Sequence, residues 1–180
     1  RKKLAGCGTN TAALAFGGQA PTVAETETWN GTNWTEVNDL GTARYGLAGC
    51  GTNTAALAFG GEVDPPISNK TELWNGTNWT EVNDLNTARD LLAGAGTQTS
   101  ALAFGGKTFA ATGATESWNG TNWTELADLA NGRFSLAGCG TANTSALAFG
   151  GDLGPGNTPE MFAGTEVWNA GPTTVTFSTS

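Results

Sequence analysis

A run of small apolar residues that ends in a double glycine occurs four times in this chain of 180 residues. Successive copies begin 43 to 45 residues apart, and the double glycines are Gly17-Gly18, Gly60-Gly61, Gly105-Gly106 and Gly150-Gly151. A unit this short cannot bury its apolar face alone, so such chains stack copies of one supersecondary unit. We predict one repeat domain over residues 1–180, with units at about 1–43, 44–88, 89–132 and 133–180.

Each unit predicts four short antiparallel strands, which the second unit shows most clearly. Residues 47–52 and 55–59 are small and apolar, and the second run ends at the double glycine, as an inner strand would. Residues 71–74 alternate polar and apolar side chains, and Asn75-Gly76 then signals a tight hairpin that returns through 79–82. The chain is therefore predicted to be all-β, with one four-stranded blade per repeat.

Three kinds of regularly spaced side chain are predicted to hold the units together. Tryptophan pairs such as Trp74 and Trp79 are expected to meet across the hairpin as core residues. Cys7, Cys50 and Cys139 share one repeat position that holds Ala95 in the third unit, which indicates a small buried site rather than a metal site. Each unit opens with an arginine that we expect to pair with an equally regular glutamate, in the order Arg1, Arg44, Arg89 and Arg133 with Glu27, Glu72, Glu116 and Glu166.

Charge and hydropathy exclude several classes of partner. Eight basic against sixteen acidic residues give a net charge of −8, which argues against binding to nucleic acid or anionic lipid. The sequence has no run of about 20 apolar residues, so we expect no membrane insertion. Because residue 1 is Arg1 rather than methionine, we expect the chain to be part of a longer product or a trimmed one.

Four apolar residues before Gly-Gly, followed by the tryptophan hairpin, resemble the kelch repeat. The resemblance spans residues 1–180, with a departure in that tryptophan stands where the family usually has tyrosine, at Trp29, Trp74, Trp118 and Trp168. It implies a kelch-like β-propeller, either four-bladed or part of a larger ring completed by further repeats or a second chain. The amino-acid sequence of the repeats is also similar to repeats in predicted tail-fibre-like and structural proteins of marine tailed phages and bacteria, which implies a virion-surface or extracellular location.

The stretch between the double glycine and the third strand is where the repeats differ. These inserts have 7, 9, 8 and 13 residues, at Gln19–Glu25, Glu62–Lys70, Lys107–Ala114 and Asp152–Gly164. In such a blade this loop emerges on the same face as the connection to the next blade, where repeat proteins commonly bind ligands. We therefore predict ligand-binding residues at Ile67, Phe109, Glu160, Met161 and Phe162, with solvated caps on the blades as the alternative.

We predict a non-enzymatic binding or structural module, a tail-fibre-like or cell-surface adhesin that recognises a glycan or protein receptor. The alternative is an architectural subunit of a virion or filament whose partners are other structural subunits, including copies of itself. Some kelch propellers are copper oxidases, but this chain has no histidine and only Tyr45 as a ligand of that type. A carboxylate pair such as Asp64 or Asp152 with Glu160 leaves a carbohydrate-active enzyme as a third alternative. No catalytic residue, metal site or cofactor is predicted.

Overall fold

The computed structural model describes residues 1–155, 164–169 and 175–176 and is built from strands. The first two sheets contain β1 (Ala5–Gly8), β2 (Ala13–Phe16), β3 (Thr26–Trp29), β4 (Trp34–Val37), β5 (Ala48–Gly51), β6 (Ala56–Phe59), β7 (Thr71–Trp74) and β8 (Trp79–Val82). The last two contain β9 (Ala93–Thr97), β10 (Ser100–Phe104), β11 (Thr115–Trp118), β12 (Trp123–Glu125), β13 (Ala137–Ala142), β14 (Ser145–Phe149), β15 (Thr165–Asn169) and β16 (Val175–Thr176). The all-β prediction and the four strands per repeat are confirmed.

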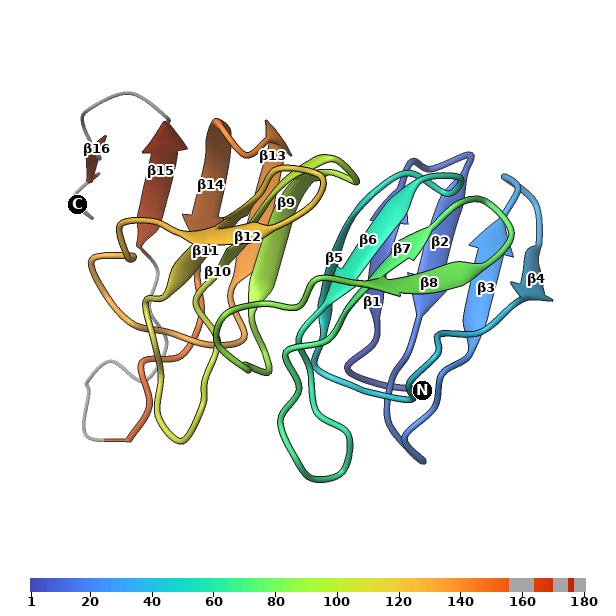
Figure 1. The fold of residues 1–180 in the computed structure, drawn as a ribbon, viewed down its shortest axis with the longest axis horizontal. Helices are drawn as coiled ribbons and strands as arrows, with labels where there is room; N and C mark the ends of the chain where they lie inside the picture. The colour runs from blue at the N-terminus through green and yellow to red at the C-terminus, as the bar shows by residue number, and fades with distance from the viewer. Residues whose placement is uncertain (156–163, 170–174, 177–180) are drawn as a thin grey trace.

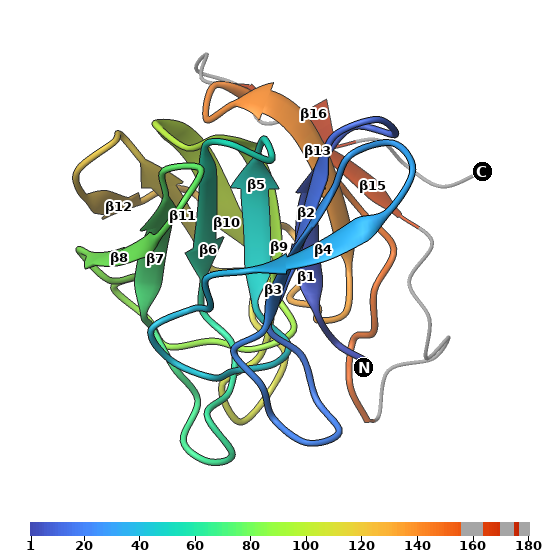
Figure 2. The ribbon, with the colours of Figure 1, turned by 90° about the vertical axis from the view of Figure 1, so that its right-hand side faces the viewer.

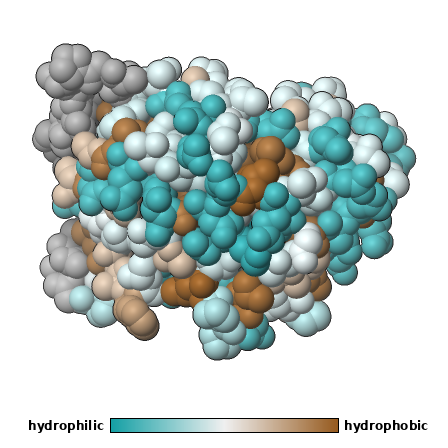
Figure 3. All heavy atoms as spheres, viewed as in Figure 1, coloured by the Kyte–Doolittle hydropathy of each residue, from teal (hydrophilic) through white to brown (hydrophobic). Residues whose placement is uncertain are grey.

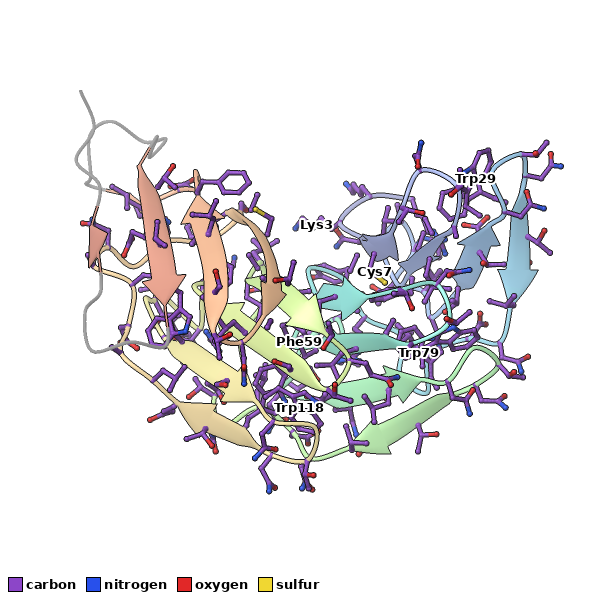
Figure 4. All side chains as sticks on the ribbon, turned by 90° about the horizontal axis from the view of Figure 1, so that it is seen from above. Lys3, Cys7, Trp29, Phe59, Trp79 and Trp118 are labelled. Carbon is purple, nitrogen blue, oxygen red and sulfur yellow. The ribbon has the colours of Figure 1, made fainter. Side chains whose placement is uncertain are left out.

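Each sheet is an antiparallel meander in chain order, and the four sheets are arranged as a four-bladed β-propeller. The first strand of each blade lies innermost, so β1 packs beside β5, β5 beside β9 and β9 beside β13. No comparable contact joins β13 to β1 within the described residues, and Figure 4 shows the first and fourth blades as the two ends of an arc. The described part of the chain contains no helix that could span a membrane.

The double glycine lets consecutive blades approach closely. Gly60 and Gly61 have φ angles of 67° and 101°, in the region that side-chain-bearing residues avoid. A Cβ atom on Gly60 would lie 2.7 Å from the carbonyl oxygen of Arg89 in the next blade. The glycine pair thus ends the second strand at a place where a side chain would collide with the neighbouring blade.

The small residues of the innermost strand make room for a phenylalanine of the preceding blade. A Cβ on Gly49 would lie 2.4 Å from Cζ of Phe16, and one on Gly94 would lie 2.5 Å from Cζ of Phe59. Phe16 and Phe59 are fully buried as a result. The crowding that the sequence predicted for this strand is therefore the contact between successive blades.

The tryptophan hairpin links a blade to its predecessor. Trp74 and Trp79 are paired across the hairpin with ring centroids 5.3 Å apart, as predicted. Trp79 also packs edge-on against Phe16, with 4.9 Å between the ring centroids, and its Nε1–H donates to Oγ1 of Thr26 over 3.0 Å. The hairpin therefore buries an aromatic ring against the preceding blade and satisfies the indole N–H there.

The regular arginines and glutamates form the predicted pairs, and three of these pairs are buried. Arg89 Nη2 donates to Oε1 of Glu116 over 2.9 Å, while Arg89 Nη1 donates to the carbonyl oxygens of Gly105 and Ala114. The Glu116 carboxylate also accepts the backbone N–H of Asn86 over 2.7 Å. The three buried pairs therefore fasten the loop between blades to the third strand. The full set of pairs is Arg1–Glu27, Arg44–Glu72, Arg89–Glu116 and Arg133–Glu166.

The fourth blade lacks the second tryptophan of the repeat, and a small gap lies between the third and fourth blades. The gap has a volume of about 20 Å³ and is lined in part by Phe104, Thr115 and Trp168. In the two preceding junctions a tryptophan packs against the residues equivalent to Phe104 and Thr115. Residues 173–178 of this repeat are rich in β-branched side chains, which favour a fourth strand, and the structure shows strand β16 at Val175–Thr176; Phe177 lies outside the described residues.

Burial of the cysteine position changes along the array. Cys50 is buried and its Sγ donates to the Thr97 carbonyl oxygen in the next blade, and Cys7 is half-buried with the equivalent contact to Thr52. Cys139 is exposed, so the prediction of a buried site was wrong there. The reason is that a following blade covers the first two positions, whereas the described residues place none beyond Cys139. Trp34 was also predicted to be a core residue, but it is 48% exposed. Its equivalents pack against a preceding blade, and the described residues place no blade before the first.

The three thiols should therefore differ in reactivity towards a disulfide reagent. In dilute solution at pH 8 we expect Cys139 to be labelled on the order of 100-fold faster than Cys7 or Cys50, since the thiolate is the attacking species. Burial raises the pKa of Cys7 to about 12 and raises that of Cys50 as well. Mass spectrometry of the labelled peptides gives the three rates. Equal labelling of Cys50 and Cys139 in the folded protein would contradict this blade order.

Candidate ligand-binding face

The first three inserts, and the described start of the fourth, leave their blades on one side of the propeller, which we call the insert face. Figures 1 and 2 show the inserts of the first three blades at the lower edge, together with the connections between blades. The Asn-Gly hairpins project from the opposite edge. The part of the sequence that differs among repeats is thus gathered on a single face, as predicted.

Backbone hydrogen bonds give each of the first three inserts a fixed shape. The Val23, Ser68 and Thr112 N–H groups donate to the carbonyl oxygens of Gly18, Gly61 and Gly106 over 2.7 to 3.0 Å. Within the second insert Val63 N–H also donates to Pro66 O, and in the third Thr108 N–H donates to Ala110 O. These contacts close compact loops on the blade ends, so a ligand would meet pre-shaped loops.

A hollow opens between the third and fourth blades on the insert face. Its volume is about 560 Å³, within the range of small-ligand sites. The third insert supplies Lys107 and Phe109, and the connection to the fourth blade supplies Phe134. The remaining lining residues are small or apolar, namely Ala110, Ala111, Gly132, Leu153, Gly154 and Pro155.

Aromatic and cationic groups face this hollow together. The Phe109 side chain is fully exposed at the tip of its insert, with no packing partner to account for it. Lys107 Nζ lies 5.7 Å from the centroid of the Phe134 ring. Brown and tan atoms lie along the lower edge in Figure 3, where Figure 1 places the inserts. The hollow can offer ring surfaces for stacking and an ammonium group as a hydrogen-bond donor.

A buried carboxylate lies beside Lys107. Asp90 is 1% exposed, and neither of its carboxylate oxygens has a hydrogen-bond partner among the described residues. Asp90 and Lys107 are joined by two backbone hydrogen bonds, of 3.1 and 2.9 Å. Burial raises the pKa of Asp90, and the positive charges of Lys107 and Lys3 oppose that shift. Asp90 is thus a buried carboxyl group that lies beside Lys107 without lining the hollow.

A second cation–ring pair lies at the start of the array. Lys3 Nζ is 5.1 Å from the centroid of the Tyr45 ring, which is buried. Burial, followed by the hydrogen bond and negative charge of Glu62, raises the pKa of Tyr45 to about 12. Tyr45 therefore stays a neutral phenol and a structural residue at physiological pH.

The predicted site residues have different outcomes. Phe109 lines the hollow, whereas Ile67 is half-buried on the same face and pairs with Glu62 in an isolated bridge within its own insert. Glu160, Met161 and Phe162 lie outside the described residues. The carboxylate pairs considered for glycoside hydrolysis, Asp64 or Asp152 with Glu160, both include Glu160, so the structure describes neither pair in full. Phe134 lines the hollow but was not among the predicted site residues, because it lies outside the inserts. Its signal was the residue after each opening arginine, which also varies: Lys2, Tyr45, Asp90 and Phe134.

Comparisons with known proteins agree with the fold. No protein-family model matches the chain, and no curated protein matches it. The solved structure of YjhT superimposes on 98% of the chain with a TM-score of 0.79. The fold is that of a β-propeller. Sequence identity to YjhT is 12%, so the likeness concerns the fold alone, and the chain spans 65% of the length of that protein.

Proposed function

We propose that this chain is a non-enzymatic binding module that recognises a surface glycan through the hollow between Lys107, Phe109 and Phe134. The observation that carries the proposal is the fully exposed Phe109 ring beside a hollow of about 560 Å³, on the face where the repeats differ. Sugar rings have apolar faces that stack on aromatic side chains, and the Lys107 ammonium is a donor for hydroxyl or carboxylate groups. A protein receptor is the alternative ligand.

The composition of the hollow supports binding rather than catalysis. Glycoside hydrolysis ordinarily uses two carboxylates flanking the bond that breaks. Lys107 is the single titratable residue among the described residues that line the hollow. The part of the chain that the structure describes also holds no cluster of three or more His, Cys, Asp or Glu side chains suited to a metal ion.

The setting we propose is a virion or cell surface, with kelch-type repeats displayed as in a tail-fibre-like protein or adhesin. A single site of this size binds a glycan weakly, and several copies on one particle raise the avidity without new contacts. The net charge of −8 favours a soluble, exposed particle. A second candidate function, an assembly subunit, is favoured by the exposed ends of the blade array.

The test is binding of the purified chain to intact bacterial cells and to a panel of neutral and acidic bacterial polysaccharides. We expect Phe109→Ala to weaken binding at least about tenfold, which corresponds to about 1.4 kcal/mol. Its melting temperature should stay unchanged because the ring is exposed. The matched control is Thr32→Ala, an exposed change on the hairpin edge, which should bind like the wild type. Equal binding by Phe109→Ala and wild type would refute the proposed site.

A further inference from the structure

The end of the array formed by the fourth blade exposes a surface that is buried in the other blades. We call this end the trailing face and define it by Ser135, Cys139, Phe149 and Gly151. Phe149 is 39% exposed, whereas its equivalents Phe16, Phe59 and Phe104 are at most 2% exposed. Those three rings are covered by the innermost strand of a following blade. The trailing face therefore presents one half of a blade junction.

The end formed by the first blade presents the other half. We call it the leading face and define it by Arg1, Lys3, Gly6 and Trp34. Trp34 is 48% exposed and its Nε1–H has no hydrogen-bond partner among the described residues, whereas the equivalent Trp123 is 6% exposed and donates to Thr71. A Cβ on Gly6 would approach only Leu14 and Ala15 of its own blade, without the ring that covers Gly49.

Backbone groups at the two ends match in the same way. At each junction the second glycine N–H donates to the arginine carbonyl of the next blade over 2.8 to 2.9 Å, in the pairs Gly18–Arg44, Gly61–Arg89 and Gly106–Arg133. The residue two positions after the arginine donates its N–H to the carbonyl oxygen of the equivalent residue in the preceding blade. These distances are 2.7 to 2.9 Å, in the pairs Gly46–Lys3, Leu91–Gly46 and Ser135–Leu91.

The ends leave these same groups without such partners within the described residues. The trailing face offers the Gly151 N–H and the Ser135 carbonyl, and the leading face offers the Arg1 carbonyl and the Lys3 N–H. Each free donor on one face has its matching free acceptor on the other. Figure 4 shows that the two faces lie apart, with Lys3 in the opening between them.

We propose that the trailing face of one chain binds the leading face of a second copy of this chain, head to tail. The contact would repeat the junction that already occurs three times within the chain, with Phe149 of one copy under Trp34 of the next and over its Gly6. A second copy is the occupant because it carries both halves of this junction. A head-to-tail contact between identical chains closes into a ring or extends as a filament, depending on its rotation.

The test is sedimentation velocity on the 180-residue chain from about 1 to 100 µM, with two variants that each block one face. Wild type should exceed the monomer mass of 18.3 kDa increasingly with concentration. Trp34→Glu and Phe149→Glu should each weaken self-association at least about tenfold. An equimolar mixture of the two variants should form a dimer, because the mixture retains one intact trailing face and one intact leading face. Labelling of Cys139 should slow as wild type associates.

Control variants keep this proposal separate from the glycan site. Phe109→Glu lies on the insert face and should associate like wild type, and thermal melts of all variants in dilute solution should show a folded monomer. Wild type that stays monomeric across the concentration range would overturn the proposal. Variants that associate like wild type, or a mixture that stays monomeric, would overturn the head-to-tail geometry.

Discussion

Replacing Arg89 by alanine is expected to lower the free energy of unfolding by about 3–5 kcal/mol, because a buried carboxylate would lose its cation. Arg89 is fully buried and Glu116 is 1% exposed. The change would also remove the donors to the Gly105 and Ala114 carbonyl oxygens. Since domains of this kind are typically stable by about 5–15 kcal/mol, the loss is a large share of the total. Urea unfolding followed by tryptophan fluorescence measures it.

The matched control occupies the same repeat position in the first blade. Arg1 pairs with Glu27 near the surface, where the glutamate side chain is 39% exposed. Exposed ion pairs contribute about 0–1 kcal/mol, so Arg1→Ala should change the unfolding free energy by no more than that. Equal losses for the two variants would show that burial of the pair is not what sets its contribution.

Replacing Phe59 by alanine is expected to cost about 3–5 kcal/mol, through lost burial and the cavity left behind. The ring lies against Gly94 of the third blade and packs edge-on on Trp123, with 5.0 Å between the ring centroids. Figure 4 shows Phe59 between the second and third blades. The variant should therefore loosen the junction between these blades, which thermal unfolding followed by near-ultraviolet circular dichroism would detect.

Phe149→Ala is the control at the same repeat position. Because the Phe149 side chain is 39% exposed, its loss opens no closed cavity, and the cost in dilute solution should stay below about 2 kcal/mol. A cost as large as that of Phe59→Ala would mean that Phe149 is covered in the monomer, which is contrary to the blade arrangement described above.

Local signals in the sequence were sufficient to predict an all-β chain with four antiparallel strands per repeat. The double glycine, the Asn-Gly turn and the alternation over 71–74 each specify a backbone conformation within a few residues, and four copies reinforce each signal. The paired tryptophans and the arginine–glutamate partners followed from equal spacing. The face on which the inserts gather followed from the antiparallel order of the strands.

Properties that depend on the neighbouring blade could not be predicted from one repeat. Cys50 and Cys139 have the same local sequence, yet only Cys50 is covered by a following blade. The sequence did not predict the hollow, because the hollow combines the insert of one repeat with Phe134 of the next. Phe134 lies 25 residues after Phe109 in the chain. Burial of Arg89 and Glu116 likewise arises where the connection from the preceding blade meets the second and third strands of the third blade.

The measurement that most directly tests the insert face as the binding surface is an exchange of inserts within the chain. In this variant Lys107–Ala114 is replaced by the sequence of Gln19–Glu25, a loop that already closes a blade of the same propeller. We expect polysaccharide and cell binding to be lost while the melting temperature stays within about 4 °C of wild type, a shift of about 1 kcal/mol. Undiminished binding by this variant would contradict the assignment of binding to the insert face and would place the binding site on another surface.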